Sequence, residues 1–194
     1  MTHVAEYVDG LPEGLRSYPQ AQCRARVVET FVGEDAQRVA ACLPEALRGL
    51  VLRPPSPLSW VPEVHAQSVF AAIREGLCES DDAFVKRARY FNRRLLSSPL
   101  FSLARLVTLS RVAKTVVATW GLAHRGSPLS ITPIGPSEME LQMWYPDMLF
   151  TDYMIRAYLT AAEETLNASG AQEASSTLLE MTPASFRARL RWAE

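Results

Sequence analysis

The apolar positions of the first two-thirds of the chain recur every three or four residues, which is the period of an α-helix. In residues 21–32, small and aliphatic side chains fall on one face, and Gly33 ends the pattern. The same period continues through residues 62–76 and 81–96. The spacing therefore predicts a helical N-terminal part, which we place at residues 19–123.

The strongest helical pattern covers residues 98–120. Ser98 can cap this helix, Pro99 suits its first turn, and Gly121 lies just beyond its end. Only a narrow polar strip around Arg111 interrupts its apolar surface. A helix of this kind is usually surrounded by protein, so we expect it to form the centre of the core.

Further along, the period changes from that of a helix to the alternation of a β-strand. Two hairpins are predicted, at residues 129–134 with 138–145 and at 175–181 with 186–192. A helix at residues 150–167 separates them. The sequence therefore predicts an α+β fold, in which an N-terminal helical bundle packs on a four-stranded antiparallel sheet with the C-terminal order β-β-α-β-β.

The length of 194 residues fits one domain. Residues 1–18, punctuated by Pro12 and Gly14, are predicted to form a flexible N-terminal segment. Residues 19–194 are predicted to form the single α+β domain, whose β-β-α-β-β part spans residues 127–193.

Three arginines alternate with apolar residues near the C-terminus. If the two hairpins share a sheet, these arginines lie on its wet face with two glutamates of the first hairpin; the residues are Arg187, Arg189, Arg191, Glu138 and Glu140. Opposite charges on neighbouring strands contribute about 0.2–1 kcal/mol per pair. The alternative is that the arginines form a site for an anionic ligand.

Charge and composition exclude some classes of protein. The formal net charge of −1 argues against a nucleic-acid binder. The longest apolar region, residues 99–123, contains Arg105, Arg111 and Lys114, which argues against a membrane span. The three cysteines lack the spacing of metal ligands, and their odd number is typical of reduced thiols in the cytoplasm. We therefore expect a cytoplasmic protein.

No motif in the sequence specifies a reaction. The glycine-rich phosphate loops and the G-x-S-x-G elbow are missing, and His3, His65 and His124 are far apart. His65 could bind a metal or heme, although a hydrogen-bonded core histidine is the commoner outcome. We expect no catalytic residue, metal ligand or cofactor.

Two pairs of adjacent carboxylates are also present. Asp81 and Asp82 suit the start of a helix, and Glu163 and Glu164 suit a solvent-facing helix surface. Adjacent helical residues point in different directions, so neither pair is expected to form an acid–base dyad.

Residues 86–94, "KRARYFNRR", form the one dense basic cluster of the sequence. It could bind RNA, anionic lipid or an acidic partner, or it could be the solvated back of a helix. The candidate partner-binding residues are Lys86, Arg87, Arg89, Arg93 and Arg94.

The order of these segments resembles a myxobacterial family of paralogous proteins of about this length. The matching segments are residues 43–62, "LPEALRGLVLRPPSPLSWVP", the helix end "VVATW" at 116–120, "LSITPIGPSEMELQMWYP" at 129–146, the helix at 150–167, and the terminal "SFRARLRW". That family is similar in architecture to heme-NO-binding domains, hydrocarbon-binding sensory domains and a lipid-holding vesicle-tethering subunit.

This resemblance implies an apolar cavity between the helices and the sheet. The chain differs from those domains in two respects. It lacks the Tyr-x-Ser-x-Arg motif that binds the heme propionates in the heme-binding domains, and it has no cysteine in the last hairpin, where the hydrocarbon-binding domains tend to carry them. Neither heme nor a cysteine-bound metal is therefore expected.

We thus predict a non-enzymatic sensory or interaction module that binds a small apolar ligand between helices and sheet. Plain core packing would give the same residue types at the predicted lining positions, which are Phe84, Phe91, Leu103, Val107, Met139, Leu141, Tyr158 and Leu159. The alternative is an adaptor that binds a protein partner through the basic helix or forms a homodimer.

Overall fold

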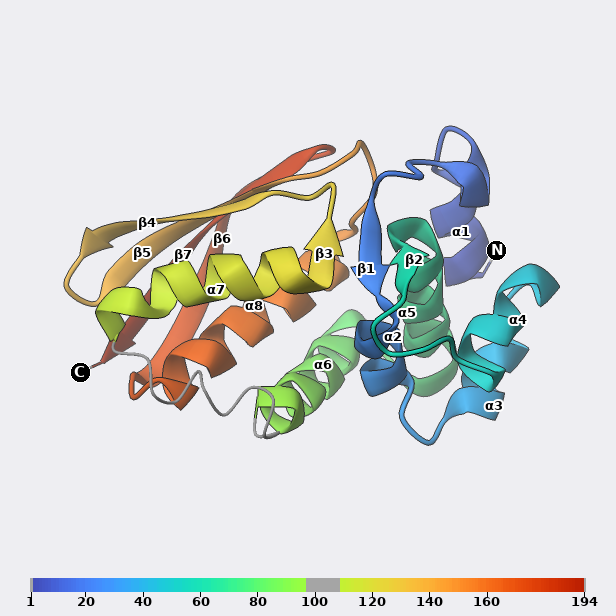
Figure 1. Ribbon diagram of the computed structural model, residues 1–194, viewed down its shortest axis with the longest axis horizontal. Helices are drawn as coiled ribbons and strands as arrows, with labels where there is room; N and C mark the ends of the chain where they lie inside the picture. Colours follow the sequence, from blue (N-terminus) through green and yellow to red (C-terminus); the bar gives the residue numbers. More distant parts are fainter. Residues whose placement is uncertain (1, 97–108, 194) are drawn as a thin grey trace.

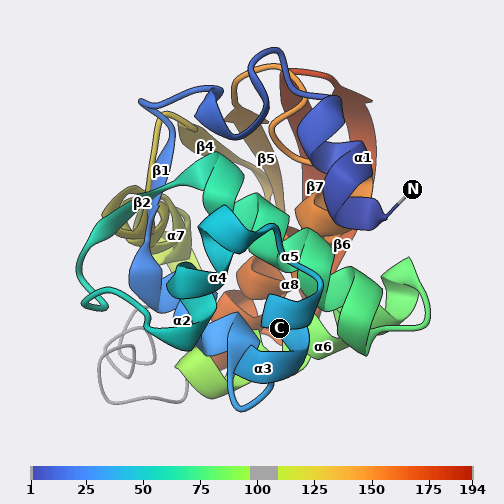
Figure 2. The same cartoon turned by 90° about the vertical axis from the view of Figure 1, so that its right-hand side faces the viewer.

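The computed structural model describes residues 2–96 and 109–193, and its helices form two groups (Figure 1). The first group contains α1 (His3–Asp9), the short 3-10 helix η1 (Gly14–Arg16), α2 (Ala25–Val32), α3 (Ala36–Ala41), α4 (Glu45–Leu52) and α5 (Glu63–Leu77). The second contains α6 (Asp81–Leu96), α7 (Leu109–Ala123) and α8 (Asp152–Ala168). In the first group α5 is central, with α1, α2, α3 and α4 around it (Figure 2).

A four-stranded antiparallel sheet follows the helices. Its strands are β4 (Leu129–Gly135), β5 (Glu138–Trp144), β6 (Gln172–Thr182) and β7 (Ser185–Ala193), in the order β4-β5-β7-β6. Helices α7 and α8 lie against one face of this sheet (Figure 1). The predicted α+β fold with its β-β-α-β-β order is therefore confirmed, and the two hairpins share one sheet.

The register of β5 against β7 explains the alternating arginines. Glu138 pairs with Arg191 across the strands, and Glu140 pairs with Arg189. The side chains form ion pairs across the strands. Arg191 Nε lies 2.7 Å from Glu138 Oε1, and Arg187 Nε lies 3.8 Å from Glu140 Oε1. The apolar side chains between the arginines face the helices and are buried. The predicted wet, charge-paired face is therefore confirmed.

Glu138 offers a direct test of this face, because it contacts both Arg189 and Arg191. We expect Glu138→Ala to lower the free energy of unfolding by about 0.5–1 kcal/mol, since the pairs are partly exposed and screened by water. Urea denaturation at low and high salt measures this effect. The loss should shrink at high salt, and a loss that is independent of salt would contradict an ionic cause.

A second, three-stranded sheet was not predicted. Its strands are β1 (Gln22–Arg24), β2 (Trp60–Pro62) and β3 (His124–Arg125), in the order β2-β1-β3. The close approach of β3 to β1 requires Gly126, whose φ is +77° and where a Cβ would lie 2.8 Å from the Cα of Ala21. This small sheet joins the end of α7 to the helical part.

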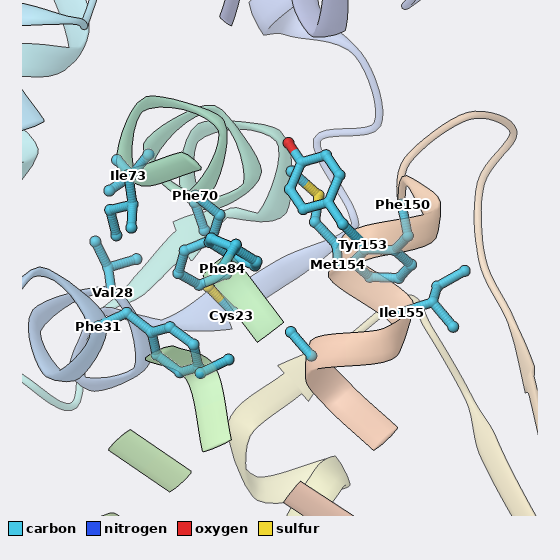
Figure 3. Packing of buried hydrophobic residues seen from close by; sticks show 14 of the residues in the cluster. Cys23, Val28, Phe31, Phe70, Ile73, Phe84, Phe150, Tyr153, Met154 and Ile155 are labelled. Carbon is cyan, nitrogen blue, oxygen red and sulfur yellow. The ribbon is translucent and has the colours of Figure 1, made fainter. Parts of the chain in front are cut away.

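The core of the described residues centres on α5 and α8, and the part of the predicted 98–120 helix whose side chains are described does not lie at its centre. Nearly every side chain of α5 from Glu63 to Ile73 is buried, whereas the described side chains of α7 are half-buried or exposed. Figure 3 shows side chains of α2, α5 and α6 meeting beside those of α8. Helix α7 is peripheral because it covers only one side of the sheet and faces solvent on the other.

Two boundaries also differ from prediction. The helix expected at 98–120 falls partly on residues 97–108, which lie outside the described residues, and its described part continues through Gly121 to Ala123. The segment at 1–18, expected to be flexible, contains α1, whose Val4 and Tyr7 are buried. The Tyr7 hydroxyl donates a hydrogen bond to the carbonyl oxygen of Leu149 at 3.0 Å, so this helix is packed into the fold.

None of the helices in the described part of the chain is both long enough and apolar enough to cross a lipid bilayer.

Candidate functional site

A buried polar cluster joins the helical part to the rest of the molecule. We call Glu63 and Gln67 of α5, His124 of β3 and Tyr158 of α8 the junction network. His124 Nδ1 lies 3.0 Å from Glu63 Oε2. The Gln67 amide Nε2 donates to Glu63 Oε1 and to the Tyr158 hydroxyl oxygen, both at 2.6 Å. Three elements that are distant in the sequence are therefore connected through one carboxylate.

Aromatic rings hold His124 in place. The Trp120 ring of α7 stacks on the imidazole with centroids 3.8 Å apart and planes 7° from parallel. Tyr158 meets both rings edge-on, at 5.2 Å from Trp120 and 5.7 Å from His124. The Trp120 indole N–H donates to the carbonyl oxygen of Ser127 at 2.6 Å. These contacts fix the imidazole beside Glu63, so the network is rigid on its α7 side.

The Glu63 carboxylate is fully buried, and its charge acts on its neighbours. Burial raises the pKa of Tyr158 well above its usual value, and the charge of Glu63 raises it further. The same two causes, in the same order, raise the pKa of the Cys23 thiol and of Tyr7. These groups therefore stay protonated at neutral pH, and the Cys23 thiol is a poor nucleophile.

Two acceptors at this junction have no partner within the described residues. Gln67 Oε1 and Ser127 Oγ are buried and form no hydrogen bond there. Buried polar atoms in folded proteins are nearly always hydrogen-bonded, and an exception requires an explanation. An ordered water or another donor would satisfy these atoms.

Sequence reasoning missed this site, because it considered His124 only as one of three distant histidines and did not single out Glu63. The residues that contact each other in the network are distant in the sequence. Glu63 and His124 are 61 positions apart, and Gln67 and Tyr158 are 91 positions apart. A weak local signal exists, since Glu63 and Gln67 are four residues apart and so share a helix face. That spacing is too common to identify a site without the fold.

The structure places the predicted lining residues in several different contacts. Phe84 packs edge-on against Tyr153, with centroids 5.1 Å apart, and Phe91 packs near Phe31 at 6.1 Å. Met139 and Leu141 are buried under the sheet, and Leu159 is buried on α8. Only Tyr158 belongs to the junction network. Leu103 and Val107 lie outside the described residues, and the predicted pocket as a whole stays a prediction.

The basic helix is α6, and it forms ion pairs within the chain. Arg89 contacts Glu163 and Glu164 of α8, Arg93 Nε lies 3.0 Å from Glu164 Oε2, and Arg87 pairs with Asp35 at 2.9 Å. We call the pairs of Arg89 and Arg93 with Glu163 and Glu164 the α6–α8 clamp. The described residues provide no carboxylate partner for Lys86 or Arg94.

The expectation that Glu163 and Glu164 face solvent is wrong, since each is only 5% exposed. Their carboxylates lie under α6, where the arginines and the Ser176 hydroxyl, which donates to Glu163 Oε1 at 2.5 Å, compensate their charge. The other pair behaves as predicted, because Asp81 and Asp82 lie in the first turn of α6.

The clamp makes stability depend on pH. Burial raises the pKa of Glu164, but hydrogen bonds and charges from Arg93 and Arg89 outweigh burial and leave it below the usual 4.5. A carboxyl group whose pKa is lower in the folded than in the unfolded state stabilises the protein above its unfolded pKa, and this contribution is lost as the pH falls through the folded pKa. We therefore expect the stability advantage of the native protein over Glu164→Gln to be present at pH 7 and to shrink below about pH 4.5.

Urea denaturation of both proteins across this pH range measures the difference. Asp82 contributes a similar acid dependence, because its hydrogen bond to Arg156 and the charge of Arg156 lower its pKa. That contribution is common to both proteins and cancels. An advantage that stays constant down to pH 3 would contradict the assignment.

Two hollows open on the surface away from the junction. A groove of about 530 Å³ lies between α2 and α6 and is lined by Arg26, Tyr90 and Phe91 among others. A second hollow of about 360 Å³ lies beside α1 and is lined by Val4, Cys42 and Leu43 among others. Both are open to solvent, and neither includes a residue of the junction network.

The fold is that of several solved heme-NO-binding (H-NOX) structures. An unliganded Fe(II) H-NOX protein from K. algicida superposes with a TM-score of 0.63 at 9% identity, covering 88% of this chain and 97% of its own. An oxygen-binding H-NOX domain related to soluble guanylate cyclases gives 0.59 at 14%, covering 87% and 92%. A mutant of the T. tengcongensis H-NOX gives 0.57 at 14%, covering 88% and 98%.

No protein-family model matches the chain, and no curated protein matches it in sequence. At 9–14% identity, the structural similarity establishes the fold alone. The predicted similarity in architecture to heme-NO-binding domains is confirmed at that level.

The histidines and the packed core of the described residues do not fit a heme. A heme needs an axial ligand such as histidine, but His65 Nε2 lies 3.2 Å from the carbonyl oxygen of Leu15, and His3 is exposed on α1 beside Glu6. His124 is held between Glu63 and the Trp120 ring. Buried side chains occupy the space between α8 and the sheet, namely Leu141, Met143, Met154, Ile155, Phe186 and Leu190.

Proposed function

We propose that this chain is a non-enzymatic sensory or interaction module that binds a small ligand at the junction network without heme. The observation that carries the proposal is the pair of buried acceptors without partners, Gln67 Oε1 and Ser127 Oγ, beside stacked aromatic rings. A flat, mostly apolar molecule with one hydrogen-bond donor matches this chemistry. The similar solved proteins include an oxygen-binding domain, which supports ligand binding by this fold.

The network is suited to sensing because it connects the helical part of the chain to the helix that covers the sheet. Glu63 and Gln67 belong to the helical part, whereas Tyr158 lies on the helix that covers the sheet. A ligand that binds one arrangement of these elements more tightly shifts the population towards it. Such a ligand would lie against the half-buried Trp120 ring, which stacks on His124.

Chemistry other than binding has little support in the described residues. The buried hydroxyl and thiol groups near Glu63 have raised pKa values, and a nucleophile needs a lowered pKa or an adjacent base. His124 is oriented by Glu63 as a histidine base would be, but within the described residues no hydroxyl or thiol is hydrogen-bonded to it, and the Trp120 ring covers one face of its imidazole. The module is therefore proposed as a binder.

Indole and benzothiophene form a matched pair of probes, because they have nearly the same shape and only indole carries an N–H donor. We expect indole to bind about fivefold more tightly, since one hydrogen bond contributes about 1 kcal/mol. NMR titration should shift the side-chain signals of Gln67 and Trp120. Native mass spectrometry of the protein purified from cells would detect a natural ligand of the same class.

Ser127→Ala tests the site without removing any hydrogen bond of the described structure, since Ser127 Oγ has no partner there. Ser175→Ala, at an exposed position of β6, is the matched control. Loss of the preference for indole in the first variant only would support the site. Equal affinity for both probes, or shifts confined to the surface grooves, would contradict it, and a saturable Soret band on titration with hemin would overturn the heme-free assignment.

The adaptor alternative receives less support from the geometry. Three of the five predicted partner-binding residues, Arg87, Arg89 and Arg93, are engaged within the chain. Binding through α6 would therefore depend on Lys86 and Arg94, and this function stays a prediction, as does homodimer formation.

A further inference from the structure

The small sheet β2-β1-β3 carries a tryptophan between two arginines. The guanidinium carbon of Arg24 lies 3.8 Å from the Trp60 ring centroid, and that of Arg125 lies 3.9 Å from it. Two groups this close to one centroid must occupy opposite faces of the ring, because on the same face they would overlap. In the sheet, Trp60 on β2 and Arg125 on β3 lie on opposite sides of β1, which carries Arg24, so the Trp60 ring and the Arg125 guanidinium meet across β1.

Arg24 also forms hydrogen bonds with two segments that carry exposed leucines. Its Nε donates to the carbonyl oxygen of Leu122 at 3.3 Å, and its Nη1 donates to the carbonyl oxygen of Leu58. The side chains of Leu58 and Leu122 are 75% and 72% exposed, more than those of the other large apolar residues that the structure describes. One guanidinium therefore holds the two most exposed leucines of the described chain beside the Arg–Trp–Arg stack.

The positive charges of this surface are not compensated. Within residues 2–96 and 109–193, neither Arg24 nor Arg125 forms an ion pair with a carboxylate, whereas the arginines of the sheet and of the α6–α8 clamp do. Arg125 is exposed and forms no described hydrogen bond. Stacking on Trp60 restricts both side chains, so less entropy is lost when an anion binds.

We propose that this patch, formed by Arg24, Trp60, Arg125, Leu58 and Leu122, is a docking surface for an acidic segment of another protein. Carboxylates of the segment pair with the two arginines, and its apolar side chains cover the two leucines. A lipid surface fits less well, because recognition of anionic membranes uses clusters of about 4–8 basic residues and this patch has two. The inference is independent of the ligand proposed for the junction network.

A fluorescent peptide of alternating Glu and Leu residues is the probe, with a Gln–Leu peptide of the same length as its neutral counterpart. We expect the full chain to bind the acidic peptide with an affinity that falls as salt rises. Arg125→Glu should weaken binding at least about tenfold, as expected for loss and reversal of a close charge pair. Leu122→Ser should weaken it less, because only apolar contact is lost.

Arg16→Glu is the matched control, since it makes the same change of charge at an exposed arginine outside the patch. Circular dichroism checks the fold of each variant, and Arg125→Gln provides a milder change if the glutamate variant does not fold. Failure to bind the acidic peptide, or an equal loss in Arg16→Glu, would overturn the proposal. So would Arg125-dependent binding to phosphatidylserine–phosphatidylcholine vesicles without peptide binding, which would assign the patch to membranes.

Discussion

Replacing His124 by alanine is expected to lower the free energy of unfolding by about 3–5 kcal/mol, which is typical when a buried carboxylate loses a group that compensates it. Glu63 is fully buried, and His124 Nδ1 is bonded to its Oε2 at 3.0 Å. Without the imidazole, the carboxylate keeps its bonds to Gln67 and Tyr158 but its Oε2 loses the contact with His124. The variant also loses the stacked contact with Trp120.

Urea denaturation of three variants separates these causes. In His124→Ala combined with Glu63→Gln the buried charge is gone, so this protein should recover part of the stability lost in the single variant. His65→Ala is the control, because His65 is half-buried and makes one hydrogen bond to Leu15, and its loss should cost about 1 kcal/mol. If the double variant is no more stable than His124→Ala, the buried charge is not the cause.

Replacing Arg89 by alanine is expected to produce the second largest effect, a loss of about 2 kcal/mol. Arg89 contacts both buried carboxylates of the α6–α8 clamp, Glu163 and Glu164. The loss should be smaller than for His124, because the Arg89 side chain is 40% exposed and water can solvate the carboxylates once it is removed.

Arg94→Ala on the same helix is the matched control for Arg89. Arg94 is exposed, and the described residues offer it no carboxylate, so its replacement should change stability by less than about 0.5 kcal/mol. Thermal unfolding of the two variants measures the difference. Similar melting temperatures would show that the clamp contributes little.

The clamp also limits how the basic helix can be tested for partner binding. Charge reversal at Arg89 or Arg93 would bring a third carboxylate next to Glu163 and Glu164, so loss of association could not be distinguished from loss of folding. Lys86→Glu and Arg94→Glu avoid this problem. They are the informative changes for the adaptor alternative.

The local pattern of apolar and polar residues predicted helices and strands well where one face of the element is buried against the core. The alternation in 186–192 places Phe186 and Leu190 inside and the arginines outside in the structure, because a strand has only two faces. The helical pattern was a poorer guide to the position of the described part of α7, since an apolar helix surface can be covered by a sheet on one side without being central. Composition cannot distinguish these two environments.

The candidate site was predicted much less well than the fold. Tyr158 was singled out for its apolar ring, but its role depends on Gln67 and Glu63, which approach it only in the folded chain. Glu163 and Glu164 were assigned to solvent because carboxylates are rarely buried. Arginines on a helix about seventy residues away make their burial tolerable.

By itself, the sequence determined the order of helices and strands, the two faces of the C-terminal sheet and the lack of a heme-propionate motif, because these depend on neighbouring residues. The tertiary structure decided which strands are adjacent, which charges are buried and which are left uncompensated. Those outcomes depend on contacts between distant segments, and the free energy of a charged side chain is set by the groups that surround it in three dimensions.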